Sequence, residues 1–205
     1  MLHRTWNEDV LHLIALHLTG QDAMNLATTS RMAYQAAILR VAASAKCDSP
    51  AQLQRFHAYI LGRTEDGRTR ARYLEDLIIS ENSFLRRRFI QRDIGAELND
   101  VVDTQVIQIM DILQAASNLR RLVIAHLYRC MCTDPRMASS LPSLHALHAL
   151  ELVCVGDEEI KTISLPPNIV TLTLSQRSSI NSAPSFLRLL VALPRLKTLM
   201  RVGIR

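Results

Sequence analysis

Long apolar runs, aromatic residues and glycines are all scarce in this chain of 205 residues, and each shortage excludes a class of protein. No run of about 18 apolar residues occurs, so the sequence predicts no membrane span. Glu8 and Asp9 interrupt the N-terminus and no small-residue cleavage site follows, which disfavours a secretory signal peptide. We therefore expect a cytoplasmic and/or nuclear protein.

The shortage of glycine and cysteine bears on chemistry. Six glycines leave few phosphate-binding loops, and none of the patterns G-x-x-x-x-G-K, G-x-G-x-x-G and G-x-S-x-G occurs. The four cysteines are too few and too scattered for a disulfide framework, and we expect them to be small buried apolar residues. Cys130-x-Cys132 has no second pair of ligands at zinc spacing. We expect no metal site and no cofactor.

Catalytic pairs are equally hard to find. Cys47 and His57 are ten residues apart, but no orienting Asp or Asn can be recognised for a nucleophile and its base. His145 and His148 are better explained as a mixed helix edge than as metal ligands, since a third ligand is missing. The sequence predicts no active site and a protein that is not an enzyme.

The charge of the chain is mildly basic, with a net charge of +5 and a pI near 9.3. Its arginines gather between Arg63 and Arg92, which is one pattern of a phosphate-binding patch. Acidic residues are interspersed there, and only 4% of the chain is aromatic, so stacking platforms are scarce. We favour a solvated linker and a polar helix face; nucleic-acid binding remains the alternative hypothesis for this region.

A short phrase, L-x-x-L-x-L with Ile allowed for Leu, recurs along the second half of the chain. The central leucines of its copies are Leu77, Leu122, Leu150, Leu172 and, in a shortened last copy, Leu199. The steps between them are 45, 28, 22 and 27 residues. Three of these four steps lie within the period of about 20–29 residues that is typical of leucine-rich repeats.

Each copy predicts a strand. The second Leu and the Leu or Ile two positions later lie on the same side of a strand, and the residue between them faces the other way. The residues between are Ile78, Val123, Glu151 and Thr173. Two connecting segments, 104–117 and 183–193, carry apolar residues at helical spacing, including Val106, Ile109, Met110 and Leu113 in the first. Helix and strand alternate, and such units bury a continuous core only by stacking on their neighbours.

This half resembles the leucine-rich-repeat family, in the divergent form found in fungal and animal adaptor proteins. The first copy, from Leu74 to Phe84, fits L-x-x-L-x-L-x-x-[N/C]-x-L with Asn82 in the Asn/Cys position. Later copies carry Leu127, Val155 and Arg177 at that position. The resemblance implies a short, irregular α/β solenoid with a parallel sheet over residues 47–205. No polar capping unit follows the last copy, so we expect either that this array is truncated at its C-terminus or that the final helix, over 185–193, serves as a crude cap.

Three short helices are predicted in front of the array. Asn7 is a good N-cap for a helix over 8–18, and Asp22 is expected to cap a second helix that ends near Thr28. An alanine-rich third helix is predicted from Ser30 to Ala45. Ser49 and Gln52 form a capping box that begins a fourth helix, which Gly62 ends.

The first helix is apolar over an unusually wide arc. Val10, Leu11, Ile14 and Leu18 fall within about 100°, and Leu13 and Ala15 widen the arc to about 200°. A unit of three short helices has little interior in which to bury so much apolar surface. We infer that this helix contacts a partner protein; the alternative is that the repeat array covers it.

Residues 1–46 resemble an F-box, the module that joins substrate receptors to SCF-type ubiquitin ligases. The residues at the positions of its pattern are Trp6, Asn7, Val10, Leu11, Ile14, Leu18, Asp22, Leu26, Ser30 and Arg31. Trp6-Asn7 replaces the usual Leu-Pro; Trp6 can supply the apolar anchor and Asn7 can begin the helix. The fold class implied is α+β, an F-box-like three-helix module before a repeat array.

The resemblance also implies a division of labour. The residues named above would bind a Skp-type linker subunit and, through it, a cullin, and the array would bind an unknown target protein for ubiquitin transfer. The alternative is a leucine-rich-repeat interaction scaffold that is not engaged in a ligase.

Overall fold

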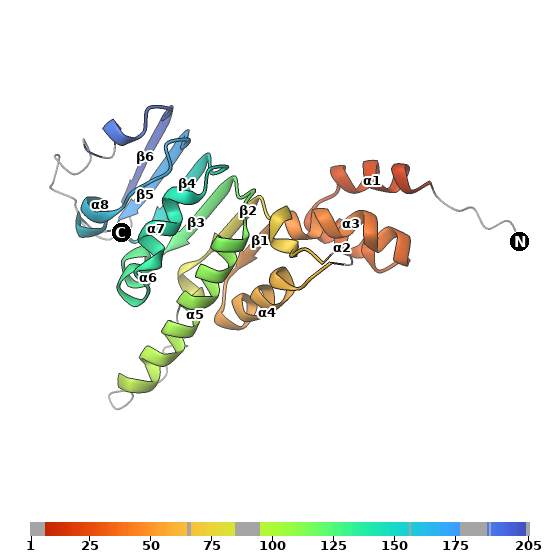
Figure 1. The fold of residues 1–205 in the computed structure, drawn as a ribbon, viewed down its shortest axis with the longest axis horizontal. Coiled ribbons are helices and arrows are strands. Elements are labelled where there is room, and N and C mark those ends of the chain that lie inside the picture. Colours follow the sequence, from red (N-terminus) through yellow and green to blue (C-terminus); the bar gives the residue numbers. More distant parts are fainter. Residues whose placement is uncertain are drawn as a thin grey trace, which may run out of the picture.

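The chain begins with three helices that pack together and continues into an α/β region built on one parallel sheet of six strands (Figure 1). The computed structural model describes residues 7–64, 67–84, 95–155, 157–176, 188 and 190–203. Its elements are α1 (Glu8–His17), α2 (Gly20–Ala27), α3 (Arg31–Ala43), β1 (Ser44–Cys47), α4 (Pro50–Leu61), the 3-10 helix η1 (Arg70–Tyr73), β2 (Asp76–Ile79), the 3-10 helix η2 (Glu81–Ser83), α5 (Gly95–Ala115), β3 (Arg121–Ala125), α6 (Leu127–Thr133), α7 (Arg136–Ser143), β4 (Ala149–Val153), α8 (Asp157–Thr162), β5 (Thr171–Gln176) and β6 (Thr198–Gly203). Within the part of the chain so described, no helix has both the length and the hydropathy that a membrane crossing requires.

Side-chain caps set where the first helices begin. The Asn7 side chain accepts a hydrogen bond from the N–H of Asp9 at 3.1 Å, which confirms Asn7 as the N-cap of α1. The expected cap of α2 is wrong. Thr19 is the N-cap, and Asp22 lies in the first turn, where its N–H donates to the Thr19 hydroxyl at 3.2 Å. Asp22 also accepts a hydrogen bond from that hydroxyl at 2.7 Å, so the two side chains close the first turn together.

The N-terminal helices share a small core of their own. Its buried members are all alanines, namely Ala15, Ala23, Ala27 and Ala37, with Leu18, Leu26 and Val41 packed against them. Each buried methyl group contributes only about 0.8 kcal/mol, so this cluster stabilises the three helices weakly. Small side chains let the helices approach closely, and among the larger side chains of α1 Leu11 is buried whereas Val10, Leu13, Ile14 and Leu16 stay exposed.

The third helix ends earlier than its sequence predicts. We expected it to reach Ala45, but α3 ends at Ala43 and the chain passes directly into β1, Ser44–Cys47. This strand pairs in parallel with β2, so pairing with a distant segment overrides the local helical preference of the alanines. The sheet therefore begins on residues that precede position 47.

All five copies of the repeated phrase form strands, which confirms their reading as strands. The strand order follows the chain from β1 to β6, and every pair is parallel. The register aligns the central leucines in one row, Leu77, Leu122, Leu150, Leu172 and Leu199. The first four leucines of this row are at most 1% exposed, and Leu199 on the last strand is 41% exposed.

The connecting helices explain which face of the sheet is buried. Successive parallel strands joined by right-handed crossovers in one direction place every connection on the same face. In Figure 1, α4, α5 and α7 lie along one side of the strands. Helix α5 supplies the four apolar residues expected at helical spacing, and all of them are buried in the main core. His57 of α4 joins Asp111 of α5 at 3.0 Å, which ties the first two of these helices together.

One detail of the first copy differs from its sequence pattern. Asn82, in the expected Asn/Cys position, is exposed, and the next residue, Ser83, is fully buried. The Ser83 hydroxyl donates to the backbone carbonyl of Cys47, an acceptor at the end of the neighbouring strand β1. The shift coincides with the 3-10 helix η2 (Glu81–Ser83), whose last residue is the buried Ser83.

The four cysteines do not share one environment. Cys47 and Cys130 are buried in the main core, as expected, whereas Cys154 is partly exposed and Cys132 is exposed. Burial, followed by the charge of Asp48, raises the pKa of the Cys47 thiol to about 11, so this thiol stays protonated at neutral pH. The expectation of four small buried residues is therefore wrong for Cys132 and Cys154.

Candidate functional site

The largest group of exposed apolar side chains among the described residues lies on the three N-terminal helices. On α1 the exposed fractions are 41% for Val10, 60% for Leu13, 38% for Ile14 and 67% for Leu16. On α2 and α3, Met24, Met32 and Tyr34 are exposed as well. Figure 1 places these helices at one end of the molecule, beyond β1 and away from the rest of the sheet. A grouped set of exposed apolar residues marks an interaction site more often than single ones do.

Helix α1 divides its apolar residues between two faces. Leu11 and Ala15, four residues apart, are buried against the helices below, and Leu18 is half buried. Val10 and Ile14, also four residues apart, form a neighbouring stripe that faces solvent. The wide apolar arc of α1 thus has two parts. One face packs in the three-helix core, and no described residue covers the other face.

The apolar residues of the F-box pattern separate in the same way. Leu11 is 7% exposed, and Leu18 and Leu26 are half buried in the alanine cluster, so all three hold the helices together. Val10 and Ile14 are available to a partner. Trp6 lies outside the residues that the structure describes.

The polar residues of the pattern mostly begin helices. Asn7 caps α1, and Ser30 caps α3 by accepting a hydrogen bond from the N–H of Ala33 at 3.1 Å. Asp22 closes the first turn of α2, as described above, and Arg31 is exposed at the start of α3. These residues position the exposed apolar side chains by fixing where each helix starts.

Two of the exposed residues on α1 were not in the expected site. Leu13 and Leu16 are the most exposed apolar side chains of this helix. The width of the apolar arc indicated Leu13, but no spacing signal distinguished Leu16.

A cavity of about 240 Å³ opens beside Leu16, between α1, α3 and η1. The apolar surface of α1 is therefore hollowed on one flank.

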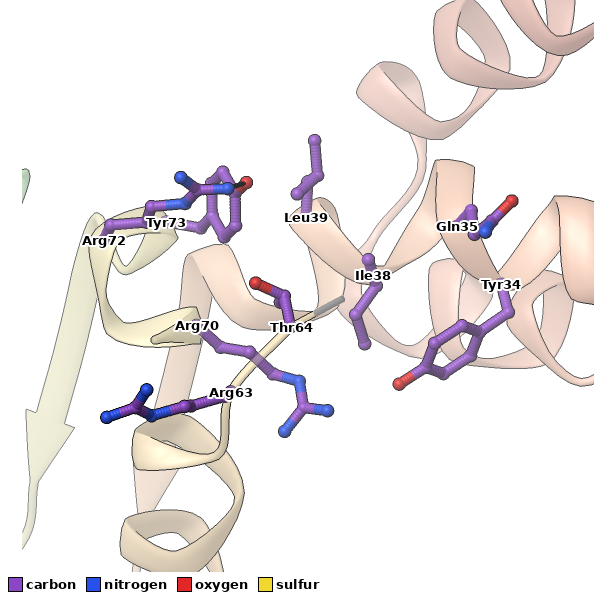
Figure 2. A pocket seen from close by; sticks show the side chains of 9 residues that line it. All are labelled: Tyr34, Gln35, Ile38, Leu39, Arg63, Thr64, Arg70, Arg72 and Tyr73. Carbon is purple, nitrogen blue, oxygen red and sulfur yellow. Dashed lines mark hydrogen bonds between the residues drawn. The ribbon is translucent and has the colours of Figure 1, made fainter. Parts of the chain in front are cut away.

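A second candidate site is a cavity of about 460 Å³ between α3 on one side and residues of 63–64 and 70–73 on the other. Figure 2 shows Tyr34, Gln35, Ile38 and Leu39 of α3 on one side and Arg63, Thr64, Arg70, Arg72 and Tyr73 on the other. None of the described residues that line this cavity is acidic, so its walls combine apolar surface with positive charge.

Two arginines of this cavity, Arg70 and Arg72, contact aromatic rings. Arg70 donates to the backbone carbonyl of Tyr59 at 2.9 Å, and its guanidinium lies 4.9 Å from the centre of the Tyr59 ring. Burial, followed by the nearby Tyr34, raises the pKa of Tyr59 to about 12, so the phenol is neutral beside this arginine. A β-carbon on Gly62 would lie 2.5 Å from Arg70 Nη1, so only glycine permits this close approach. Arg72 stacks on Tyr73 at 4.4 Å.

The comparisons with known proteins add no name to this geometry. No protein-family model matches the chain, and no curated protein matches it either. The candidate function therefore depends on the residues and surfaces described above.

Proposed function

We propose that the protein is a substrate-recognition adaptor of an SCF-type ubiquitin ligase. Helices α1, α2 and α3 dock on a Skp-type linker subunit, and the α/β region binds the target protein. The observation that supports docking most directly is the solvent-facing stripe of Val10 and Ile14 on a helix whose other face is already packed. Burying a side chain of this size contributes about 1.5–3 kcal/mol before the cost of association is counted, so the stripe and its exposed neighbours favour a contact together.

The proposal takes the α/β region to be a leucine-rich-repeat solenoid. The sequential order of parallel strands, the row of aligned leucines and the helices on one side all support it. The turns also repeat. His126 after β3 and Cys154 after β4 both have left-handed backbone, with φ of 53° and 61°. Successive units that leave their strands by the same unusual turn are what a repeated unit predicts.

The target would bind the face of the sheet opposite the helices. Along that face the register aligns Lys46, Ile78, Val123, Glu151, Thr173 and Met200, one from each strand. Asp76 and Arg121 form a cross-strand ion pair on the same face at 3.1 Å. Lys46, Ile78, Glu151 and Met200 are at least partly exposed on this face, whereas Val123 and Thr173 are each only 8% exposed. The exposed groups include both charged and apolar side chains, which suits a protein target better than a polyanion.

The experiment is capture of a purified Skp-type subunit by variants of the full chain. Val10→Asp with Ile14→Asp would place two charges at the exposed stripe without entering the alanine core. We expect binding to fall about 100-fold or more, since two apolar anchors are lost and two charges are desolvated. Leu11→Asp is unsuitable, because Leu11 is buried and its substitution would disturb the packing of α1.

A matched control makes the same chemical change at the other end of the molecule. Leu190→Asp with Val191→Asp replaces two exposed apolar residues far along the chain, and capture should be unchanged. Leu13→Asp with Leu16→Asp tests whether the other exposed apolar side chains of α1 also contact the Skp-type subunit. If Val10→Asp with Ile14→Asp binds as tightly as the unmodified chain, the docking assignment is wrong.

The alternatives give different results in the same assay. A repeat scaffold outside any ligase folds normally and captures no Skp-type subunit. Nucleic-acid binding through the arginines of 63–92 would show an affinity that falls steeply with salt. Residues 85–92 of that stretch lie outside the described residues, and three of its described arginines, Arg63, Arg70 and Arg72, line the cavity of Figure 2.

A further inference from the structure

Three side chains with metal-binding atoms meet at one edge of the sheet. Glu81, His126 and Cys154 each offer one donor atom, and the three donors lie within 4.8 Å of one another. His126 Nε2 and Glu81 Oε1 lie 3.5 Å apart. All three residues are partly exposed, so an ion could reach them from solvent. These residues are far apart in sequence, so no local spacing predicted the cluster.

The register of the strands explains why they meet. β2, β3 and β4 are neighbours, with Ile79 opposite Ile124 and Ala125 opposite Val153. Continuing these pairs beyond the strand ends sets Glu81 beside His126, and His126 beside Cys154. Neighbouring strands are about 4.8 Å apart, so equivalent residues at this edge are brought within reach of a common ligand. Figure 1 shows the three strands side by side.

The backbone and a neighbouring ring help to orient two of the donors. His126 and Cys154 are the non-glycine residues of the described chain with positive φ. Non-glycine residues adopt this conformation at an energetic cost, and they often do so at functional sites. The His126 ring also packs edge-on against Phe84, with ring centres 5.8 Å apart at 88°. The imidazole is therefore held in place before any ligand arrives.

We propose that Glu81, His126 and Cys154 form a binding site for a divalent transition metal, most suitably Zn²⁺. Zinc accepts oxygen, nitrogen and sulfur ligands together, at about 2.0–2.3 Å. In a tetrahedral site with such bonds, an N–O edge is about 3.4 Å, close to the 3.5 Å between His126 and Glu81. The S–N and S–O edges of such a site are about 3.6 Å, so the sulfur needs to move by about 1.4 Å at most, which a side-chain rotation supplies.

The triangular arrangement of the three donor atoms fits a metal site better than a catalytic relay. In a relay of nucleophile, base and orienting acid, the imidazole stands between the other two groups. Here the thiol and the carboxylate also lie within 4.8 Å of each other, so all three donors surround a common point. Bound zinc would join β2, β3 and β4 at one edge, with a fourth position open to water or to a side chain of a bound protein.

The test uses the full chain, stripped with a chelator and titrated with Zn²⁺ against a chromophoric competitor. Co²⁺ is then added in place of zinc, because a thiolate ligand gives cobalt a charge-transfer absorption band. We expect one equivalent of metal and a cobalt–thiolate band. Loss of a residue that merely supports a ligand costs about 10–100-fold in metal affinity, so loss of a ligand should cost about 100-fold or more.

The variants are Cys154→Ser, His126→Asn and Glu81→Gln; asparagine tolerates the left-handed backbone at position 126. Cys154→Ser should abolish the cobalt–thiolate band, and all three variants should bind zinc more weakly than the unmodified chain. Cys132→Ser is the control, because this thiol is exposed and outside the cluster. An unmodified chain without the band, or Cys154→Ser with unchanged affinity and normal circular dichroism, would overturn the proposal.

Discussion

At the scale of single residues, the structure shows how one side chain can fix the start of a helix. Asp134 precedes α7 (Arg136–Ser143), whose N-cap residue, Pro135, offers no side-chain hydrogen bond. The Asp134 carboxylate takes over this role by accepting the N–H of Arg136 at 2.9 Å. The Arg136 guanidinium donates to both of its oxygens as well, at distances between 2.6 and 3.0 Å.

These contacts predict an acid-sensitive contribution to stability. The Arg136 side chain, through its hydrogen bonds, holds the pKa of the Asp134 carboxyl below its ordinary value of 3.8. A carboxyl whose pKa is lowered by folding stabilises the protein above about pH 4, and this contribution is lost as the pH falls through the lower, folded-state pKa. We expect Asp134→Asn to lower the free energy of unfolding at pH 7 and to have much less effect near pH 2. Urea denaturation at the two pH values measures this, and an equal effect at both would contradict it.

The capping box expected at the start of α4 forms with the predicted residues, but one of its hydrogen bonds is shifted by one residue. The expected capping box of α4 (Pro50–Leu61) is half present, since the Ser49 hydroxyl accepts from the N–H of Gln52 at 3.3 Å. The Gln52 side chain, however, accepts from the N–H of Asp48 at 2.7 Å, one residue before the cap. The sequence therefore located the helix start, and the path of the chain out of β1 decided which amide the glutamine reached.

At the scale of elements, the alternation of buried and partly exposed residues along β2 and β4 decides which substitutions matter there. In β4 (Ala149–Val153), Leu150 is 1% exposed and packs in the main core, and Glu151 is partly exposed on the opposite face. The same alternation recurs in β2, where Leu77 and Ile79 are buried. Neighbouring residues of β4 therefore lie on opposite faces of the sheet, one covered by helices and the other open.

Adjacent residues of β4 should therefore respond very differently to the same substitution. Leu150→Ala leaves a cavity in the core and should cost about 2–5 kcal/mol in the free energy of unfolding. Glu151→Ala should change it by about 0.5 kcal/mol or less, because it removes no buried contact. Chemical denaturation of both variants tests this, and a similar loss in the two would mean that both faces of the sheet are buried.

At the scale of the whole molecule, two apolar cores of unequal strength lie along the chain. The main core extends from β1 to β5 and contains large aliphatic side chains from strands and helices. The N-terminal core is a cluster of alanines. Helix α3 contributes to both, since Ala37 belongs to the small cluster and Ala42 to the large one. It therefore connects the proposed docking helices to the sheet.

This inequality predicts two levels of hydrogen-exchange protection. Amides of α1 and α2 should exchange much faster than those of β2, β3 and β4, because opening the alanine cluster exposes little apolar surface. The α3 amides should fall between the two. Binding of a Skp-type subunit should slow exchange in α1 and α2 and leave the sheet unchanged. Equal protection of α1 and β3 in the free chain would contradict the separation of the cores.

Local sequence was sufficient for the elements whose signals are local or periodic. The repeated leucine phrase located β2 to β6, and apolar spacing located α5, because a strand or a helix shows its buried face as a period of the sequence. The cap at Asn7 and the wide apolar arc of α1 likewise follow from the order of the residues alone.

Tertiary contacts decided what depends on residues far apart in the chain. Ser44–Cys47 is a strand because β2 pairs with it, although its neighbours favour a helix. Leu11 is buried and Ile14 exposed because α3 covers only one side of α1. Glu81, His126 and Cys154 meet because three strand ends share a register. Periodicity tells which residues of an element share a face, whereas packing alone decides which face is covered and which side chains become neighbours.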